Sequence, residues 1–488
     1  MAQPPSKGRR HIPTRDELAS VSDDGSRIAL HPADVRGRFN TWRRITAILL
    51  IAVYVLLPWI PVKGNPAVLL DAANLRFHFF GLTLAAQDFW LFFFLISGLG
   101  FLLFYVTALF GRLWCGWACP QTIFLEHVFR RIERVLEGDS GARRRLDHSP
   151  WTTEKFLRRG TKQFLFIVVS LVVAHVLLAY FVPLPSVWGM VTHAPAENWG
   201  VFVFIVATTG VVYFNFAWFR EQLCIILCPY GRLQSALIDD DSVVIGYDAV
   251  RGEPRGPLKG KCVEPGPGAG DCIDCFRCVN VCPTGIDIRQ GLQMECIGCS
   301  ACIDACDDVM DRIKRPHGLI RYDSMNGLAG LKTRFLRPRT ILYSVLLLVG
   351  VVVAAVSVSR YRPAAFNLVR MQSAPYFVDA NSVRNQFLVR VINKQTAPVD
   401  FSLRVVSPGG DGPGPGFQTA GWEESVRVGL GGEEVRLLVI VVPREAYNGR
   451  FPLEIQVTGE PGNIVLKGTV EFLGPDPELF KAHYAPGR

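Results

Sequence analysis

Long apolar runs alternate with polar segments along this chain, and they set its architecture. Each of five runs is about as long as a helix needs to cross the ~30 Å hydrocarbon core of a bilayer. A polar, basic arm precedes the first run, and no cleavage-site pattern follows it, so we expect an uncleaved membrane anchor. The sequence therefore predicts five spanning helices, at 43–62, 89–110, 163–184, 199–219 and 339–358.

The distribution of Lys and Arg predicts the orientation of these spans. The arm 1–42 and the connection 111–162 are rich in arginine, whereas 63–88 carries only Lys63 and Arg76, and 185–198 carries no Lys or Arg. Positive residues concentrate on the cytoplasmic side of membrane proteins. We therefore expect the N-terminus and residues 220–338 to be cytoplasmic and the C-terminal segment to lie on the outer side.

Residues 363–488 have a different pattern. The stretches "NQFLVRVINKQTAPVDFSLRVVSPGG", "EVRLLVIVVP" and "FPLEIQVTGEPGNIVLKGTVEF" alternate apolar and polar positions between turn-forming residues. Short strands at this spacing are typical of a β-sandwich. We expect one such domain on the outer face, after the fifth span.

Composition agrees with a membrane protein and restricts its chemistry. The chain is 49% hydrophobic and only 19% charged. Its formal net charge of +9 comes from basic residues in membrane-flanking segments, without interleaved aromatic residues, so we do not expect it to bind nucleic acid. All 13 cysteines lie between 115 and 306, a distribution that favours reduced, metal-ligating thiols over a disulfide scaffold.

Two cysteine runs between the fourth and fifth spans carry the clearest chemistry. "CIDCFRCVNVCP" (272–283) and "CIGCSACIDACD" (296–307) both have the spacing C-x₂-C-x₂-C-x₃-C, by which bacterial ferredoxins hold two [4Fe–4S] clusters, the fourth cysteine of each run ligating the other cluster. Zinc is the rival, but tandem four-cysteine runs without histidine partners fit zinc poorly. The predicted ligand sets are Cys272, Cys275, Cys278 and Cys306 for one cluster and Cys282, Cys296, Cys299 and Cys302 for the other. Cys262, outside both runs, is expected to be a free surface thiol.

A second cysteine pattern occurs twice, at the ends of the second and fourth spans. "LWCGWACPQ" and "LCIILCPYG" each contain C-x₃-C-P, so Cys115 and Cys119 share one helix face, as do Cys224 and Cys228. Each proline can begin a new helix, whose N-terminus would lower the thiol pKa of Cys119 and Cys228. Soft thiolates at a membrane edge suit Cu⁺ or a further iron–sulfur cluster. The pattern leaves open whether the four thiols form one site or two.

Two neighbouring features accompany these motifs. "PQTIFLEHVFRRIERVLEG" reads as a basic amphipathic helix lying in the membrane surface. His127, His175 and His193 are each more typical of structural histidines than of ligands, although a non-covalent haem held by His175 and another histidine stays an alternative. No C-x-x-C-H occurs, which argues against covalently attached haem.

The stretches "RLWCGWACPQT", "WFREQLCIILCPYGRLQ", "GDCIDCFRCVNVCPTGIDIRQGLQMECIGCSACIDACDDVMDRI" and "GLIRYDS" resemble the cytochrome c oxidase accessory protein family CcoG, also called FixG or RdxA/RdxB. The likeness extends from about residue 36 to the end. It implies a membrane polyferredoxin of the bacterial inner membrane with a periplasmic immunoglobulin-like domain. It further implies reduction of Cu²⁺ to Cu⁺ during maturation of a cbb-type oxidase, with Cys115, Cys119, Cys224 and Cys228 associated with copper reduction.

Together these patterns predict a multi-domain membrane protein. Its parts are a cytoplasmic arm, a helical bundle, a two-cluster ferredoxin-like domain, a fifth span and an immunoglobulin-like β-sandwich. The expected boundaries are 1–42, 43–219, 220–338, 339–358 and 363–488.

Three functions compete on this basis. The leading one is a cupric reductase that takes electrons from a cytosolic donor and serves the oxidase assembly machinery through copper chaperones or transporters. The second is oxidation of quinol, as in NapH-type membrane ferredoxins, which also pair spans with C-x₃-C-P and clusters. The third is a non-catalytic assembly factor. The sequence leaves the donor, the copper acceptor and the oligomeric state open, a homodimer included.

Overall fold

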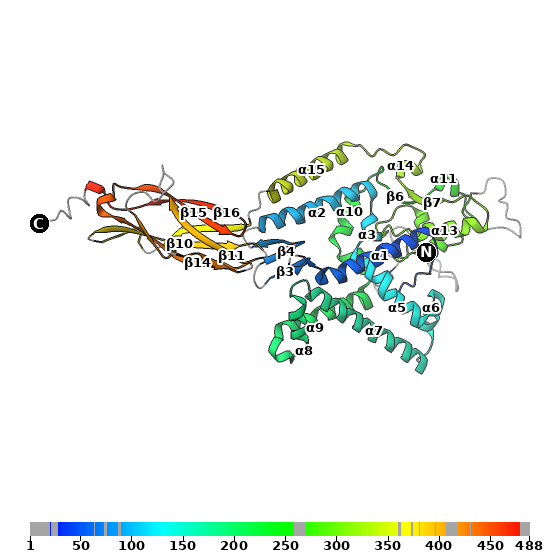
Figure 1. The fold of residues 1–488 in the computed structure, drawn as a ribbon. Helices are drawn as coiled ribbons and strands as arrows, with labels where there is room; N and C mark the ends of the chain where they lie inside the picture. The colour runs from blue at the N-terminus through cyan, green and yellow to red at the C-terminus, as the bar shows by residue number, and fades with distance from the viewer. Residues whose placement is uncertain are drawn as a thin grey trace, which may run out of the picture. The chain divides into compact units, whose positions relative to one another are not determined.

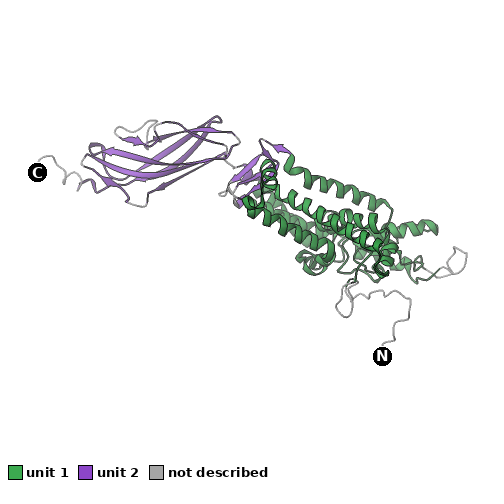
Figure 2. Cartoon of the chain, turned by 90° about the horizontal axis from the view of Figure 1, so that it is seen from below, with its two compact units in different colours: residues 1–59, 92–354 green, residues 60–91, 355–488 purple. Residues whose placement is uncertain are grey.

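The computed structural model of the chain contains two compact units, 1–59 with 92–354 and 60–91 with 355–488 (Figure 2). Each unit is described by itself. The structure describes residues 20, 28–62, 64–72, 76–85, 89–257, 270–359, 363–371, 374–379, 381–395, 397–406, 417–422, 424–429 and 431–478. Cys262 lies outside these residues.

Five helices of the described chain are long and apolar enough to cross a membrane, which confirms the predicted bundle (Figure 1). The first and third of these helices begin before their apolar runs, because polar turns precede the apolar stretch. Thr152 caps the third helix, α7, by accepting a hydrogen bond from the backbone N–H of Lys155. The helices are α1 (Arg38–Leu56), α2 (Phe89–Phe110), α7 (Thr153–Leu178), α9 (Trp199–Phe214) and α15 (Pro338–Ser359).

Short helices connect these spans at the end where the cysteine motifs lie. π-Helical turns at Leu125–Phe129, Asn215–Phe219 and Leu223–Leu227 interrupt them; such turns are rare and are frequent at functional sites. The connecting helices are α3 (Leu113–Trp117), α4 (Pro120–Phe124), α5 (Arg130–Glu137), α6 (Ser140–His148) and α10 (Pro229–Leu237), with α8 (Leu184–Thr192) and a 3₁₀ turn at Pro195–Asn198 at the other end of α7 and α9.

The segment after Pro120 corrects one expectation. We expected a basic amphipathic helix lying in the membrane surface, but Arg130 and Glu133 are buried within the protein. Arg130 pairs with Glu126 and Glu221, and Glu133 pairs with Arg143 and Arg220, so the basic residues belong to an internal ion-pair network. Buried charges are tolerated when each has a partner, which a helical pattern alone does not reveal.

The two cysteine runs are framed by a short antiparallel pair, β6 (Val244–Tyr247) and β7 (Ile320–Asp323). Helix α12 (Arg277–Asn280) follows in the first run and α13 (Ala301–Arg312) in the second. Both helices start directly after a residue in the left-handed conformation, Phe276 (φ 57°) and Ser300 (φ 58°). The repeated backbone indicates two equivalent half-sites. Minor elements nearby are α11 (Ala249–Gly252), α14 (Met325–Leu328) and a 3₁₀ turn at Ile288–Gln290.

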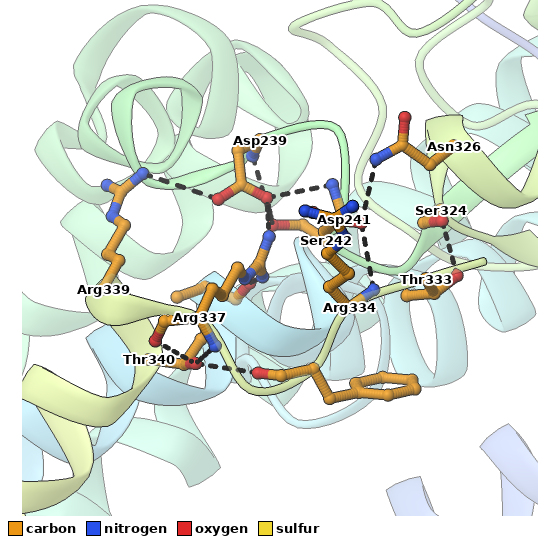
Figure 3. Close-up of polar contacts among 12 residues, drawn as sticks. Asp239, Asp241, Ser242, Ser324, Asn326, Thr333, Arg334, Arg337, Arg339 and Thr340 are labelled. Carbon is orange, nitrogen blue, oxygen red and sulfur yellow. Dashed lines mark hydrogen bonds and ion pairs between the residues drawn. The ribbon is translucent and has the colours of Figure 1, made fainter. Parts of the chain in front are cut away.

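This cysteine domain is attached to the ends of the spans. The buried carboxylate of Asp304 accepts hydrogen bonds from the backbone N–H groups of Phe39 (3.2 Å) and Asn40 (2.7 Å) in the first turn of α1. Ser242 Oγ donates to the carbonyl oxygen of Ala108 at the end of α2. Figure 3 shows the surrounding cluster, in which Asp239 pairs with Arg337 and Arg339 at the start of α15. The domain therefore lies against the ends of three spans.

Unit 2 contains the predicted sandwich, and all its strand pairs are antiparallel. Buried residues from two sheets meet in one core, among them Phe387, Leu438, Phe401 and Leu453. One sheet has the order β12-β14-β10-β8 with β9 beside β10, and the other β13-β11-β15-β16. The strands are β8 (Ala364–Arg370), β9 (Phe377–Val378), β10 (Ser382–Asn393), β11 (Val399–Val406), β12 (Gln418–Ala420), β13 (Val426–Val428), β14 (Glu433–Pro443), β15 (Phe451–Glu460) and β16 (Ile464–Phe472), with a 3₁₀ turn at Arg444–Ala446.

The same unit contains small sheets between the first two spans that the sequence analysis did not predict. A 3₁₀ turn at Leu57–Trp59 leads into them. The strands are β1 (Pro61–Val62), β2 (Asn65–Pro66), β3 (Val68–Asp71), β4 (Arg76–Phe79) and β5 (Leu82–Ala85), paired as β1-β2 and β3-β4-β5. Strands of two to four residues give too short an alternation for recognition in a linking segment.

Candidate functional site

The eight cysteines of the two runs separate into two groups of four. In the first group, the thiol of Cys306 lies within electrostatic range of Cys272 and Cys275, and that of Cys278 within range of Cys275 and Cys306. The fourth cysteine of the second run therefore joins three cysteines of the first, as the crossed spacing predicts.

The second group surrounds a small cavity. Cys282, Cys296, Cys299 and Cys302 line it together with isoleucine side chains and Cys278 of the first group. The thiol of Cys302 lies within electrostatic range of the other three and of Cys278. The two groups are therefore neighbours across Cys302 and Cys278.

The donor sets fit iron–sulfur clusters better than single ions. Among the described residues, no three Cys, His or carboxylate side chains converge closely enough to hold one metal ion, as zinc would require. In a cubane each thiolate ligates a different iron atom, so its sulfur atoms are more widely spaced. Burial raises the pKa of Cys296 to about 12 and that of Cys299 to about 11, so these thiols are neutral at pH 7 until a metal displaces their protons.

The two C-x₃-C-P motifs converge on one place. The thiol of Cys224 lies within electrostatic range of Cys119, Cys115 and Cys228, and that of Cys115 within range of Cys119 and Cys228. Cys119 and Cys228 are both extended residues directly before the helices that Pro120 and Pro229 begin. We call these four cysteines the four-thiol site; the sequence had left one site or two open.

The expected acidity of Cys119 is wrong. Burial raises its pKa, and the backbone N–H groups of Thr122 and Gln121 only partly offset this. Burial likewise raises the pKa of Cys115 to about 11 and that of Cys224 to about 12. A helix N-terminus is a weaker influence than removal of the thiol from water. Soft metal ions would bind here with release of protons.

The four-thiol site lies directly against the second cysteine group. A Cβ atom at Gly116 would lie 2.5 Å from the carbonyl oxygen of Gly298, between Cys296 and Cys299, so only glycine permits this approach. Trp117 Nε1 donates to the hydroxyl of Tyr322 (3.1 Å), which donates to the same Gly298 carbonyl (3.0 Å).

Arg112 contributes positive charge between the two sites. Its guanidinium donates to the carbonyl oxygen of Gly231 (2.7 Å) on α10, and it is one of the charges that favour the thiolate forms of Cys115, Cys224 and Cys296. An arginine in this position stabilises negative charge on either sulfur group.

Gln234 is a site residue that the sequence analysis missed. It is fully buried on α10, and its amide Nε2 lies 3.3 Å from the sulfur of Cys115. A hydrogen bond from this amide would stabilise a thiolate. The available signal was a glutamine on the buried face of the helix that Pro229 begins, six residues after Cys228.

The three histidines lie in different surroundings. His175 and His193 each make a hydrogen bond through Nδ1 to a carbonyl oxygen of their own helix, that of Leu171 (2.8 Å) and that of Gly189 (2.6 Å). Such local bonds are typical of structural histidines. His127 lines a polar cavity with Cys299 at its wall.

Comparisons with known proteins agree with this arrangement. Residues 219–325 match the family described as a 4Fe-4S dicluster domain, residues 90–137 a 4Fe-4S binding domain, and residues 354–475 the IG-like fold at the C-terminal of FixG. The second of these regions contains Cys115 and Cys119 and ends within α5.

Three relatives cover much of the chain. Protein RdxA of Cereibacter sphaeroides is 38% identical over 78% of this chain and 82% of its own, and Protein RdxB of the same organism is 36% identical over 81% and 85%. The nitrogen fixation protein FixG of Rhizobium meliloti is 37% identical over 62% of this chain and 58% of its own.

Among solved structures, a FixG-related protein from Vibrio parahaemolyticus is 16% identical, with a TM-score of 0.21 over 23% of this chain and 97% of its own. The E. coli chaperone DraB is 17% identical, with a TM-score of 0.17 over 23% and 56%. With two paired cysteine runs, five apolar helices and relatives that match most of its length, the chain belongs to the FixG/RdxA/RdxB family of membrane iron–sulfur electron-transfer proteins.

Proposed function

We propose that this protein is a cupric reductase, which reduces Cu²⁺ to Cu⁺ at the four-thiol site and supplies the Cu⁺ for assembly of a cbb-type oxidase. The observation that carries the proposal is the convergence of four half-buried cysteines beside the loop of Cys296 and Cys299. Two bound [4Fe–4S] clusters would supply the single electrons that this reaction consumes.

The residues of the four-thiol site have distinct roles in this proposal. Two of the thiolates at a time bind copper as substrate, because no three of the described cysteines converge closely enough to hold one ion. Sulfur ligands favour Cu⁺ over Cu²⁺. Gln234 stabilises the thiolate charge through its buried amide, and Arg112 stabilises it through its guanidinium. Because the four cysteines are half-buried, the surrounding protein limits access of water to bound copper.

Serine substitutions test this function. The Cys115→Ser/Cys228→Ser double variant should lose cupric reduction, because serine is a poor ligand for Cu⁺, and should keep the EPR signals of the ferredoxin clusters. Cys262→Ser, outside both runs, is the matched control and should reduce copper normally. Normal cupric turnover in the double variant would refute the proposal.

The same four thiols could instead ligate a third iron–sulfur cluster. Metal analysis distinguishes a bound cluster from bound copper. Protein purified without oxygen should contain about eight irons if only the two runs hold [4Fe–4S] clusters, and about twelve if the four thiols hold a third. Bound copper with about eight irons would support the leading proposal.

We also propose that the cysteine domain is cytoplasmic and the sandwich periplasmic, in a bacterial inner membrane. The arginine-rich segments that predict this orientation are those beside the cysteine domain. Protease added to spheroplasts should digest residues 363–478 and leave 220–338 intact; the reverse pattern would overturn the orientation.

A cavity favours quinol oxidation as a second candidate function. It has a volume of about 260 Å³ and lies among Phe110 at the end of α2, Ser235 on α10, and Cys296. Asp239, part of the cluster in Figure 3, lines it too. A mainly apolar cavity at a membrane edge, with a cluster ligand at its wall, suits the ring of a quinol.

Filling this cavity tests the second candidate. Ser235→Trp should abolish reduction of the clusters by a quinol analogue in detergent and spare reduction by dithionite. Val250→Trp, at a position 84% exposed, is the control. Cluster reduction by the analogue at the normal rate in Ser235→Trp would exclude this cavity as a quinol site.

A further inference from the structure

A second cavity carries an excess of positive charge. It has a volume of about 30 Å³, space for about two water molecules. Arg43 of α1, Arg131 and Arg134 of α5, His127 and the sulfur-bearing Cys299 line it, with the carboxylates of Asp34 and Glu126. We call it the arginine cavity.

The two carboxylates are already paired. Asp34 Oδ1 lies 2.9 Å from Arg134 Nε, and Glu126 pairs with the buried Arg130. Within the described residues, Arg131 makes no ion pair or hydrogen bond. Arg43 and Arg131 therefore have no carboxylate of their own in the cavity. Asp34 and Glu126 still lie within electrostatic range of Arg131, and Arg43 favours the thiolate form of Cys299.

Arg43 is the strongest sign of a missing partner. Arg43 is only 6% exposed, and its Nε donates to the carbonyl oxygen of Gly116 (3.0 Å). Its Nη2 has no hydrogen-bond partner in the described structure, and neither has the buried Nε of Arg44. An unsatisfied buried guanidinium costs several times what a hydrogen bond contributes, so an anionic acceptor is expected here.

The electrostatics of the neighbours agree with an absent anion. Burial, and then the charge of Arg43, lower the pKa of His127 to about 4, so the imidazole is neutral at pH 7. Burial, and then Arg44, also lower the pKa of Arg131, and the carboxylates of Asp34 and Glu126 only partly offset this. Cations that repel one another across a small polar cavity favour a ligand with at least one negative charge.

The position of the cavity points to the membrane as the source of that ligand. Arg43 and Arg44 lie in the second turn of α1, and the next residues on the outer face of this helix, Ile45, Ile48 and Leu49, are 51%, 69% and 62% exposed. Such exposed aliphatic side chains on a spanning helix face lipid tails. These residues lie on the side of α1 opposite Arg43, and they place the cavity at the depth at which phospholipid head groups meet the helix.

We propose that the arginine cavity binds the phosphate group of an anionic membrane phospholipid. Arginine is well suited to phosphate because its planar donors match two oxygen atoms at once. Bound there, one phosphate group joins α1, α5 and the Cys299 loop, and through Arg43 the backbone of the first C-x₃-C-P motif. The proposal does not depend on copper reduction.

Lipid binding to the whole protein tests the proposal. Delipidated protein in detergent is titrated with phosphatidylglycerol, with phosphatidylcholine and, separately, with inorganic phosphate, and bound ligand is counted by native mass spectrometry. Wild-type protein should retain one phosphatidylglycerol. Arg131→Gln should weaken this binding about tenfold or more, since it removes a charge-assisted hydrogen bond.

Matched variants make the result specific. Arg145→Gln removes an exposed arginine of the neighbouring helix α6 and should bind like wild type. Arg131→Lys should retain part of the affinity. The melting temperature of Arg131→Gln without lipid shows whether this variant folds. If it does not fold, Arg44→Gln provides a second test. Arginine-dependent binding of inorganic phosphate but not of lipid would support the phosphate site and overturn its membrane source. Equal lipid binding by wild type, Arg131→Gln and Arg44→Gln, or no binding of either probe, would overturn the proposal.

Discussion

Gly116 is the residue at which the four-thiol site and the second cysteine group touch. Any side chain there would overlap the backbone of Ile297 and Gly298, at 2.8 Å and 2.5 Å from their carbonyl oxygens. Glycine in a short helix is normally a cost, so its presence here is explained by the contact rather than by the helix.

We predict that Gly116→Ala keeps its ferredoxin iron but loses about tenfold or more of its cupric reduction, because the two sites must move apart and small displacements are costly in catalysis. Gly100→Ala on α2, where a Cβ meets nothing within 4 Å, is the control. Iron analysis and copper turnover of both variants check this. Wild-type turnover by Gly116→Ala would show that the contact is unimportant.

Glu133 pairs with two arginines of the ion-pair network, Arg143 and Arg220. Burial would raise its pKa, but the charge and hydrogen bond of Arg220, with smaller contributions from Lys162 and Arg130, outweigh burial and lower it to about 2. A depressed carboxyl pKa stabilises the folded state above about pH 4.5, and this contribution is lost as the pH falls toward 2.

We therefore predict that Glu133→Gln lowers the free energy of unfolding by about 3–5 kcal/mol at pH 7, since it leaves buried arginines unpaired. The difference from wild type should shrink as the pH falls below 4.5. Glu154→Gln, which breaks an exposed pair with Arg158, should cost at most about 1 kcal/mol. Thermal unfolding in detergent at several pH values measures both, and a pH-independent difference would contradict the assigned charge.

Among the helices, α13 connects the cysteine domain to the membrane bundle. Its Asp304 accepts two backbone hydrogen bonds at the start of α1, whereas Asp308, one turn later, pairs with Arg277 and Arg312 at the surface. The same residue type on one helix thus has two different roles.

We predict that Asp304→Ala destabilises the protein by about 1–2 kcal/mol, the usual cost of a lost helix cap. Asp308→Ala should cost at most about 1 kcal/mol, because surface ion pairs contribute little. Melting temperatures of the two variants in the same detergent compare them. Equal destabilisation would mean that Asp304 does not connect α13 to α1.

The elements also show which features a sequence can disclose. Apolar runs predicted the five spans, and cysteine spacing predicted which cysteines group, because both signals are local. The single four-thiol site depends on packing of the second and fourth span ends, more than a hundred residues apart in the sequence, which spacing alone does not specify. The ion-pair network escaped prediction because Glu133 and Arg130 have the pattern of solvent-facing residues.

At the scale of the molecule, the membrane unit and the sandwich have separate cores. The buried residues of the sandwich core all lie between Ala364 and Phe472, and Tyr447 extends it by donating to the carbonyl oxygen of Pro475 (2.9 Å). A core made only from its own strands is the usual condition for independent folding.

We predict that residues 363–478 expressed alone are soluble and unfold in one cooperative transition, with a β-sheet circular dichroism spectrum. The remaining protein, ending at residue 359, should keep its iron and its cupric reduction, since every residue of the four-thiol site and of both cysteine groups belongs to the other unit. Iron analysis and copper turnover of the truncated protein are the measurements. If truncation abolished copper reduction while iron was retained, the sandwich would contribute to catalysis; if only oxidase assembly failed, its contribution would be docking of the oxidase.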